Sequence, residues 1–197
     1  MKGTRRGLQV AMILAMILLC AWTPSARADS IDERMVPCLA CHGEKGQSTI
    51  PEIPSLGAQP SPYVLIQLYL FREKLRRFDI MNEALKGFTD DHLRTFADTI
   101  SRLPPPQPMA GTTDPARMAR GQALVHLHRC NVCHNPDLAG RDNIPRIAGQ
   151  REDFLVKTMR EYKANIRAGY DASMGDVMQP IPDADILDLA YFSARQP

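Results

Sequence analysis

The pentapeptide Cys38–His42 reads Cys-Leu-Ala-Cys-His, and the same pattern returns at Cys130–His134 as Cys-Asn-Val-Cys-His. In both places two residues separate the cysteines, and a histidine follows directly. A second string, Ile53–Gln59, returns as Ile144–Gln150, with Ile-Pro at its start and Gln at its end. Self-similarity of this kind indicates a duplicated structural unit. We therefore expect two domains of the same fold, one around each pentapeptide.

The match continues to the end of each repeat, and the offset between partners drifts by only one or two residues. The further equivalent pairs are Tyr63 and Phe154, Phe71 and Tyr162, Arg76 and Arg167, Met81 and Met174, Phe88 and Ile181, Leu93 and Ile186, and Ala97 and Ala190.

A proline-rich segment separates the repeats. Leu103–Pro108 reads Leu-Pro-Pro-Pro-Gln-Pro and is expected to form a stiff, extended connector because proline cannot continue a helix. Asp114 and Pro115 then supply an N-cap and a first helical residue. The expected organisation is a signal peptide at 1–28, a first domain at 29–103, a linker at 104–113 and a second domain at 114–197.

Both halves are expected to be all-α. Apolar residues at helical spacing predict helices at Tyr63–Phe78 and Glu152–Ile166. Thr89 and Pro182, each followed by aspartate, mark the start of a last helix in each half. No segment alternates as a strand would, and the Gly-, Pro- and Asn-rich segments after each pentapeptide are expected to be loops. The apolar face of the first predicted helix would consist of Leu65, Leu68, Tyr69 and Leu75.

The first 28 residues are typical of an export signal. Basic residues precede the apolar run Val10–Ala21, and Ala26–Ala28 offers small residues for cleavage. The run is short for a membrane span, so we expect cleavage before Asp29 and a periplasmic protein; an uncleaved signal anchor is the alternative. Cleavage would lower the 24 Lys and Arg to 20 against 22 Asp and Glu, a formal charge of −2. Such a charge gives nucleic-acid binding no support.

Cleavage would remove Cys20 and leave four of the five cysteines. An even number of cysteines in an exported chain usually suggests disulfides, but a histidine directly after each pair indicates covalent attachment of a c-type haem. The two thiols add to the haem vinyl groups, and the histidine becomes an iron ligand. A redox dithiol would need a βαβ context, and a zinc site would need a second ligand pair; neither is present. We therefore expect two covalently bound haem c groups. The attachment residues are Cys38, Cys41, Cys130 and Cys133, and the iron-ligating histidines are His42 and His134.

Methionine and histidine are the usual ligands on the opposite face of the iron. Met81 and Met174 are the only methionines at equivalent places in the two repeats, and each is expected on a loop before the last helix. Met178, four residues beyond Met174, is the alternative in the second half. His92 corresponds to Asp185 on a predicted exposed helix and is expected at the surface. His126 and His128 have no counterpart in the first half and are expected to be solvated or packing residues.

A ligating histidine needs an acceptor for its second ring nitrogen. Pro54 and Pro145 follow the two pentapeptides at a similar interval. Our hypothesis is that a backbone carbonyl beside each proline is that acceptor.

In its order of motifs, each present twice, the chain resembles a class I dihaem cytochrome c and is most similar to the cytochrome c4 type. The resemblance spans about residues 31–195. It implies two tandem class I cytochrome c domains, each wrapping one haem, with crossing N- and C-terminal helices. It also implies axial ligand pairs His42 with Met81 and His134 with Met174. One departure is that only Asp29–Pro37 precedes the first pentapeptide, so the helix crossing is in doubt in that half.

The resemblance implies an electron carrier rather than an enzyme, working between a donor dehydrogenase or membrane complex and a terminal acceptor such as an oxidase. Redox proteins, including a quinol-oxidising complex, are the expected partners, and peripheral membrane association stays open. One alternative is a cytochrome subunit of a dehydrogenase. Another is a dihaem peroxidase or thiosulfate-oxidising enzyme, although the cleaved chain would have no spare cysteine to act as a displaceable iron ligand. Arg72, Lys74, Arg76 and Arg77 form either a docking patch or an ordinary solvated helix face.

Overall fold

The computed structural model describes residues 31–167 and 172–197, so the predicted signal peptide lies outside the described residues. Within these ranges the chain is helical, and the single isolated bridge joins Arg141 to Ile144. The all-α prediction is therefore confirmed. None of the helices in the described ranges has the length and apolar character needed to cross a membrane.

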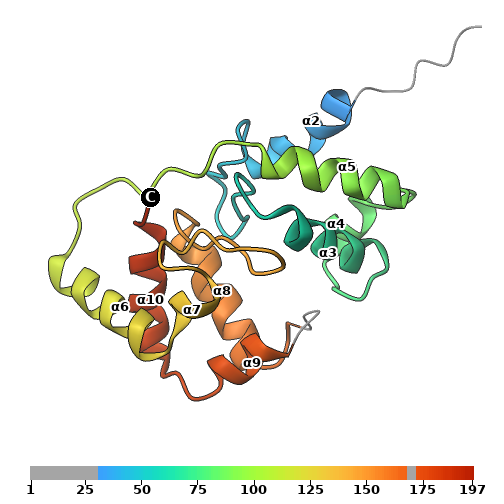
Figure 1. Cartoon of the computed structure of the whole chain (residues 1–197). Coiled ribbons are helices and arrows are strands. Elements are labelled where there is room, and N and C mark those ends of the chain that lie inside the picture. The colour runs from blue at the N-terminus through green and yellow to red at the C-terminus, as the bar shows by residue number, and fades with distance from the viewer. Residues whose placement is uncertain (1–30, 168–171) are drawn as a thin grey trace, which may run out of the picture. The chain divides into compact units, whose positions relative to one another are not determined.

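The first half places a core between its long helices (Figure 1). Its helices are α2 (Ile31–His42), α3 (Ser61–Arg72), α4 (Asp79–Ala84) and α5 (Asp90–Ser101). Thr89 caps α5 as predicted: its hydroxyl accepts from the His92 N–H, and the His92 ring accepts from the Thr89 N–H. The cap and the buried residues Leu93, Phe96 and Ile100 hold α5 against α3.

The prediction for the first long helix was wrong in length and partly in face. Helix α3 ends at Arg72, and Lys74 then adopts the left-handed conformation (φ 57°). Leu68 is buried as expected, but Tyr69 and Leu75 are exposed, while Val64 and Phe71 are buried instead. Apolar residues surround α3 on nearly every side, so their spacing does not select one face.

The second half contains α6 (Pro115–Leu127), α7 (Cys130–Cys133), α8 (Glu152–Lys163), α9 (Ser173–Met178) and α10 (Asp183–Ala194). Asp114 caps α6 as predicted, because its carboxylate accepts from the Ala116 N–H at 2.8 Å. Helix α10 packs against both α6 and α8 (Figure 1). Its buried residues Ile186, Leu189 and Ala190 form the centre of the second core.

The loop before α3 and the loop before α8 turn in the same way, as a duplication requires. Ala58 and Gly149 are equivalent residues with φ of 51° and 65°. The Ala58 N–H donates to the Leu103 carbonyl at 3.1 Å, and the Gly149 N–H donates to the Ser193 carbonyl at 3.0 Å. Each loop is thereby fixed to the end of the last helix of its own half. The exact domain limits stay a prediction.

A glycine allows α6 and α10 to cross closely. A Cβ atom on Gly121 would overlap the Cβ of Phe192 and the carbonyl oxygen of Asp188. Beside the crossing, the Asp188 carboxylate accepts from Arg117 at 2.9 Å and from Arg120 at 2.7 Å. In the described part of the first half, α2 contacts α5: Met35 is buried in the same core as Leu93, and the Arg34 guanidinium lies 3.3 Å from the His92 ring.

We predict that Gly121→Ala lowers the free energy of unfolding by about 1–3 kcal/mol, because the added methyl group overpacks the crossing. Denaturant unfolding of the holoprotein measures this. The matched control is Gln122→Ala, an exposed position on the same helix, which should change stability by less than about 0.5 kcal/mol. Equal effects of the two substitutions would contradict the close approach.

Candidate haem sites

Each cysteine pair lies within one helical turn. Cys38 and Cys41 are in the last turn of α2, and Cys130 and Cys133 are the two ends of α7. Residues three apart share a helix face, so both thiols of a pair are available to one ligand edge. All four are free thiols. The first of each pair is half-buried, and burial raises the pKa of the Cys38 and Cys130 thiols.

The histidine after each pair is buried and has a fixed ring orientation. Nδ1 of His42 lies 2.8 Å from the Pro54 carbonyl oxygen, and Nδ1 of His134 lies 2.8 Å from the Pro145 carbonyl oxygen. Because a carbonyl can only accept, Nδ1 carries the proton and donates it, which leaves Nε2 with its lone pair free for a metal. The hypothesis about the proline carbonyls is confirmed.

Burial favours the neutral form of both imidazoles. His42 and His134 are 8% and 5% exposed. Desolvation lowers the pKa of both rings, although the proline carbonyls act in the opposite direction. A neutral imidazole with a defined tautomer is the form that binds iron.

The two matched methionines lie on short helices, so the expectation that they lie on loops was wrong. Met81 is in α4 and Met174 is in α9. Each is half-buried and packs against the core of its own half, as do Cys38 in the first half and Cys130 in the second. A helix of six residues has little stability of its own and forms here because it packs on that core.

Met178 has a different environment from Met174. It is 2% exposed and belongs to the second core, and its equivalent in the first repeat is Leu85, which is 3% exposed in the first core. A position filled by leucine in one repeat needs an apolar side chain rather than a sulfur ligand. The structure therefore favours Met174 over Met178 as the ligand candidate.

Asn82, next to Met81, fixes α4 to the end of α3 and was not found by sequence reasoning. Its buried side-chain amide donates to the Phe71 carbonyl at 2.6 Å and to the Arg76 carbonyl at 2.9 Å. In the second half Lys163 and Gln179 have this role, each donating to the carbonyl of the other at 2.7 Å. The two repeats use different residues here, so comparing them gave no signal.

No family model matches the chain. Cytochrome c4 of Pseudomonas aeruginosa is 24% identical over 196 residues, which cover 94% of this chain and 96% of that protein. The thiosulfate dehydrogenase electron acceptor of Thiomonas intermedia is 28% identical over 203 residues, covering 98% and 92%. The crystal structure of reduced cytochrome c4 from Pseudomonas stutzeri matches 86% of this chain and 100% of its own with a TM-score of 0.75 at 24% identity.

Over nearly its whole length the chain is similar to cytochromes c4 in sequence and in fold. It is a dihaem electron carrier with two covalently bound haem c groups, one in each of two class I cytochrome c domains.

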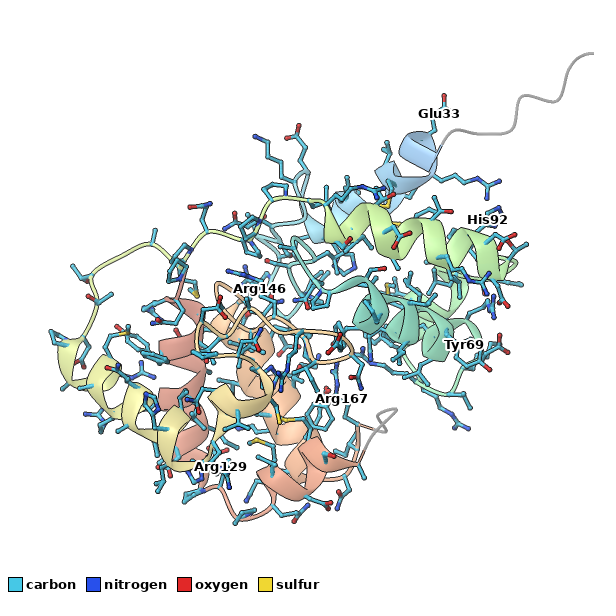
Figure 2. All side chains as sticks on the ribbon, viewed as in Figure 1. Glu33, Tyr69, His92, Arg129, Arg146 and Arg167 are labelled. Atoms are coloured by element: carbon cyan, nitrogen blue, oxygen red, sulfur yellow. The ribbon has the colours of Figure 1, made fainter. Side chains whose placement is uncertain are left out.

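Buried charge in this c4-type cytochrome fits the haem, which carries anionic propionate groups. Arg76 and Arg167 are equivalent residues, and both are largely buried (Figure 2 labels Arg167). Burial and the nearby charge of Arg167 lower the pKa of Arg76 to about 10. The Glu161 carboxylate is 3.4 Å from Arg167. Two buried cations near one carboxylate are suited to further anions.

The basic cluster identified in the sequence does not form one solvated helix face. Arg72 pairs with Asp90 at 2.7 Å and with Glu73 at 2.8 Å, and the Arg76 guanidinium lies over the Phe71 ring at 4.4 Å. Only Lys74 and Arg77 of the cluster are exposed. The chain turns sharply after Arg72, and this turn separates charges that are neighbours in the sequence.

We predict that each cysteine pair of this cytochrome binds one haem. The intact mass of the exported protein should exceed that of the polypeptide by two haems, and the double variant Cys130→Ala with Cys133→Ala should lose one of them because no thiol remains to form a thioether. The matched variant Cys38→Ala with Cys41→Ala should lose the other. Retention of both haem masses in either variant would contradict the assignment.

Proposed function

We propose that this cytochrome transfers electrons in the bacterial periplasm, from a donor dehydrogenase or a membrane quinol-oxidising complex to a terminal acceptor such as an oxidase. The observation that carries the proposal is the pair of 2.8 Å bonds that fix His42 and His134 in the metal-binding tautomer. When bound, each haem supplies a one-electron ferric–ferrous couple. Export would follow cleavage of residues 1–28.

The ligand sets follow from the repeat. In the first half, Cys38 and Cys41 would attach the haem, and His42 and Met81 would ligate its iron. In the second half, Cys130, Cys133, His134 and Met174 would have the same roles. With both a histidine and a methionine as ligands, each iron would have no site left for a substrate, which suits electron transfer, and the thioether would raise the reduction potential.

A dehydrogenase is the donor that the comparisons favour most specifically. The relative from Thiomonas intermedia, which covers nearly the whole chain, is described as the electron acceptor of thiosulfate dehydrogenase. An enzyme of that class is therefore the second, narrower candidate for the donor. The haem chemistry is the same for a freely diffusing carrier and for a fixed subunit of such an enzyme.

The donor proposal is tested by mixing oxidised holoprotein with thiosulfate dehydrogenase and thiosulfate, and in parallel with a quinol-oxidising complex and quinol. We expect one donor to reduce both haems much faster than its small-molecule substrate does alone, as followed by the visible absorption bands. Reduction by both enzyme systems at only the rate of the uncatalysed controls would contradict it.

The ligand proposal predicts a graded loss of the weak charge-transfer band that methionine–iron ligation gives at the red end of the visible spectrum. Met81→Leu and Met174→Leu should each remove about half of the band intensity, since each opens one of two haems. Met178→Leu is the control and should keep the full band, because leucine occupies the equivalent position in the first half. The reverse result for Met174 and Met178 would assign the ligand to Met178.

A further inference from the structure

Two buried glutamines join the halves through matched pairs of hydrogen bonds. The Gln59 side chain donates from Nε2 to the Arg146 carbonyl at 2.9 Å, and its Oε1 accepts from the Arg146 N–H at 3.0 Å. The Gln150 side chain bonds the Ser55 carbonyl and N–H in the same way, both at 2.8 Å. Gln59 and Gln150 are equivalent residues, 5% and 3% exposed. We call these four bonds the glutamine clamp.

The clamp acts on the peptides that orient the iron-ligating histidines. The Ser55 N–H belongs to the Pro54–Ser55 peptide, whose carbonyl accepts from His42. The Arg146 N–H belongs in the same way to the peptide whose carbonyl accepts from His134; Arg146 lies in the loop before α8 (Figure 2). Each glutamine therefore binds the peptide that holds the histidine of the opposite half.

A peptide that donates through its N–H becomes a stronger acceptor at its carbonyl, because hydrogen bonds in a chain polarise one another. A stronger acceptor at Nδ1 makes the imidazole a more basic ligand. A more basic ligand stabilises ferric over ferrous iron and lowers the reduction potential. Loss of one glutamine should therefore raise the potential of the haem in the other half.

We propose that Gln59 and Gln150 are crossed positioning residues: each sets the strength of the histidine–proline hydrogen bond, and with it the reduction potential, in the half to which it does not belong. The proposal rests on His42 and His134 as iron ligands. It also provides a direct physical connection between the two redox centres, since each centre depends on a side chain supplied by the other half.

The test compares Gln59→Met and Gln150→Met, which keep the side-chain length and remove the amide. In reduced holoprotein, NMR follows solvent exchange of the two Nδ1 protons, and redox titration of the assigned haem resonances gives each potential. Of the two bonds that Gln59→Met removes, the one to the Arg146 N–H acts on the peptide that holds His134. Its loss should speed exchange at His134 by about two- to tenfold, a range that corresponds to one hydrogen bond, and raise the potential of the second haem. Gln150→Met should do the same at His42 and the first haem.

The chain offers a matched control. Gln47 forms the same reciprocal pair with the Gln107 backbone, at 3.3 Å and 3.2 Å, but that peptide holds no histidine. Gln47→Met should leave both Nδ1 protons and both potentials unchanged. Effects confined to the half that carries the substitution, equal effects on both halves, or effects no larger than those of the control would each overturn the proposal.

A second measurement needs no variant and covers the case in which the methionine variants do not fold. In unmodified holoprotein the N–H groups of Ser55 and Arg146 should exchange with solvent more slowly than the N–H of Gln107, whose acceptor is exposed. Exchange as fast as that of Gln107 would show that the clamp is not formed. Failure of the ligand proposal is distinguishable, because the unmodified protein would then lack the methionine–iron band while the Ser55 and Arg146 N–H groups still exchanged slowly.

Discussion

The hydrogen bond from a histidine ring nitrogen to a proline carbonyl is the constraint on which each half depends. It selects the tautomer that leaves Nε2 available to iron, in a ring whose neutral form is favoured by burial. To form it, the chain must pass beneath the ring a short distance after the pentapeptide. The left-handed turns at Ala58 and Gly149 and their bonds to the ends of α5 and α10 hold the loop in that path.

The two halves preserve this arrangement with different supports. The second half crosses α6 and α10 at Gly121, whereas in the described part of the first half α2, which itself carries the pentapeptide, contacts α5. The methionine-bearing helix is tied to its neighbour by a buried asparagine in one half and by a lysine–glutamine pair in the other. Duplicated sites of this kind keep the position of the donor atoms and let the residues that secure them diverge.

Because the haem-site residues recur in both repeats while the residues that support them differ, the sequence predicts the former better than the latter. The pentapeptides and the prolines could be identified because their chemistry requires one residue type at one place, and the two repeats show it twice. The matched methionines were selected on the same ground, and their ligand role stays a prediction. The buried face of α3 was misjudged because apolar residues surround it. The short helices around Met81 and Met174 were missed because packing rather than propensity stabilises them. Arg72 and Arg76 have fixed partners only after the chain turns back, which no local pattern reveals.

The contact between the halves shows how a repeated interaction survives divergence. Each glutamine bonds to a backbone N–H and carbonyl, so the interaction does not require a particular side chain at that position, which is serine in one repeat and arginine in the other. The acceptors nonetheless differ. Gln150 Oε1 also accepts from the Arg151 N–H at 3.0 Å, whereas Gln59 precedes Pro60, which has no N–H to donate. Because of Pro60, Gln59 Oε1 accepts from the Arg146 N–H and not from the residue that follows Gln59, whereas Gln150 Oε1 accepts from both the Ser55 N–H and the Arg151 N–H. The two histidine-holding peptides therefore have matching backbone geometry, but the glutamine oxygens that bind their N–H groups differ as acceptors.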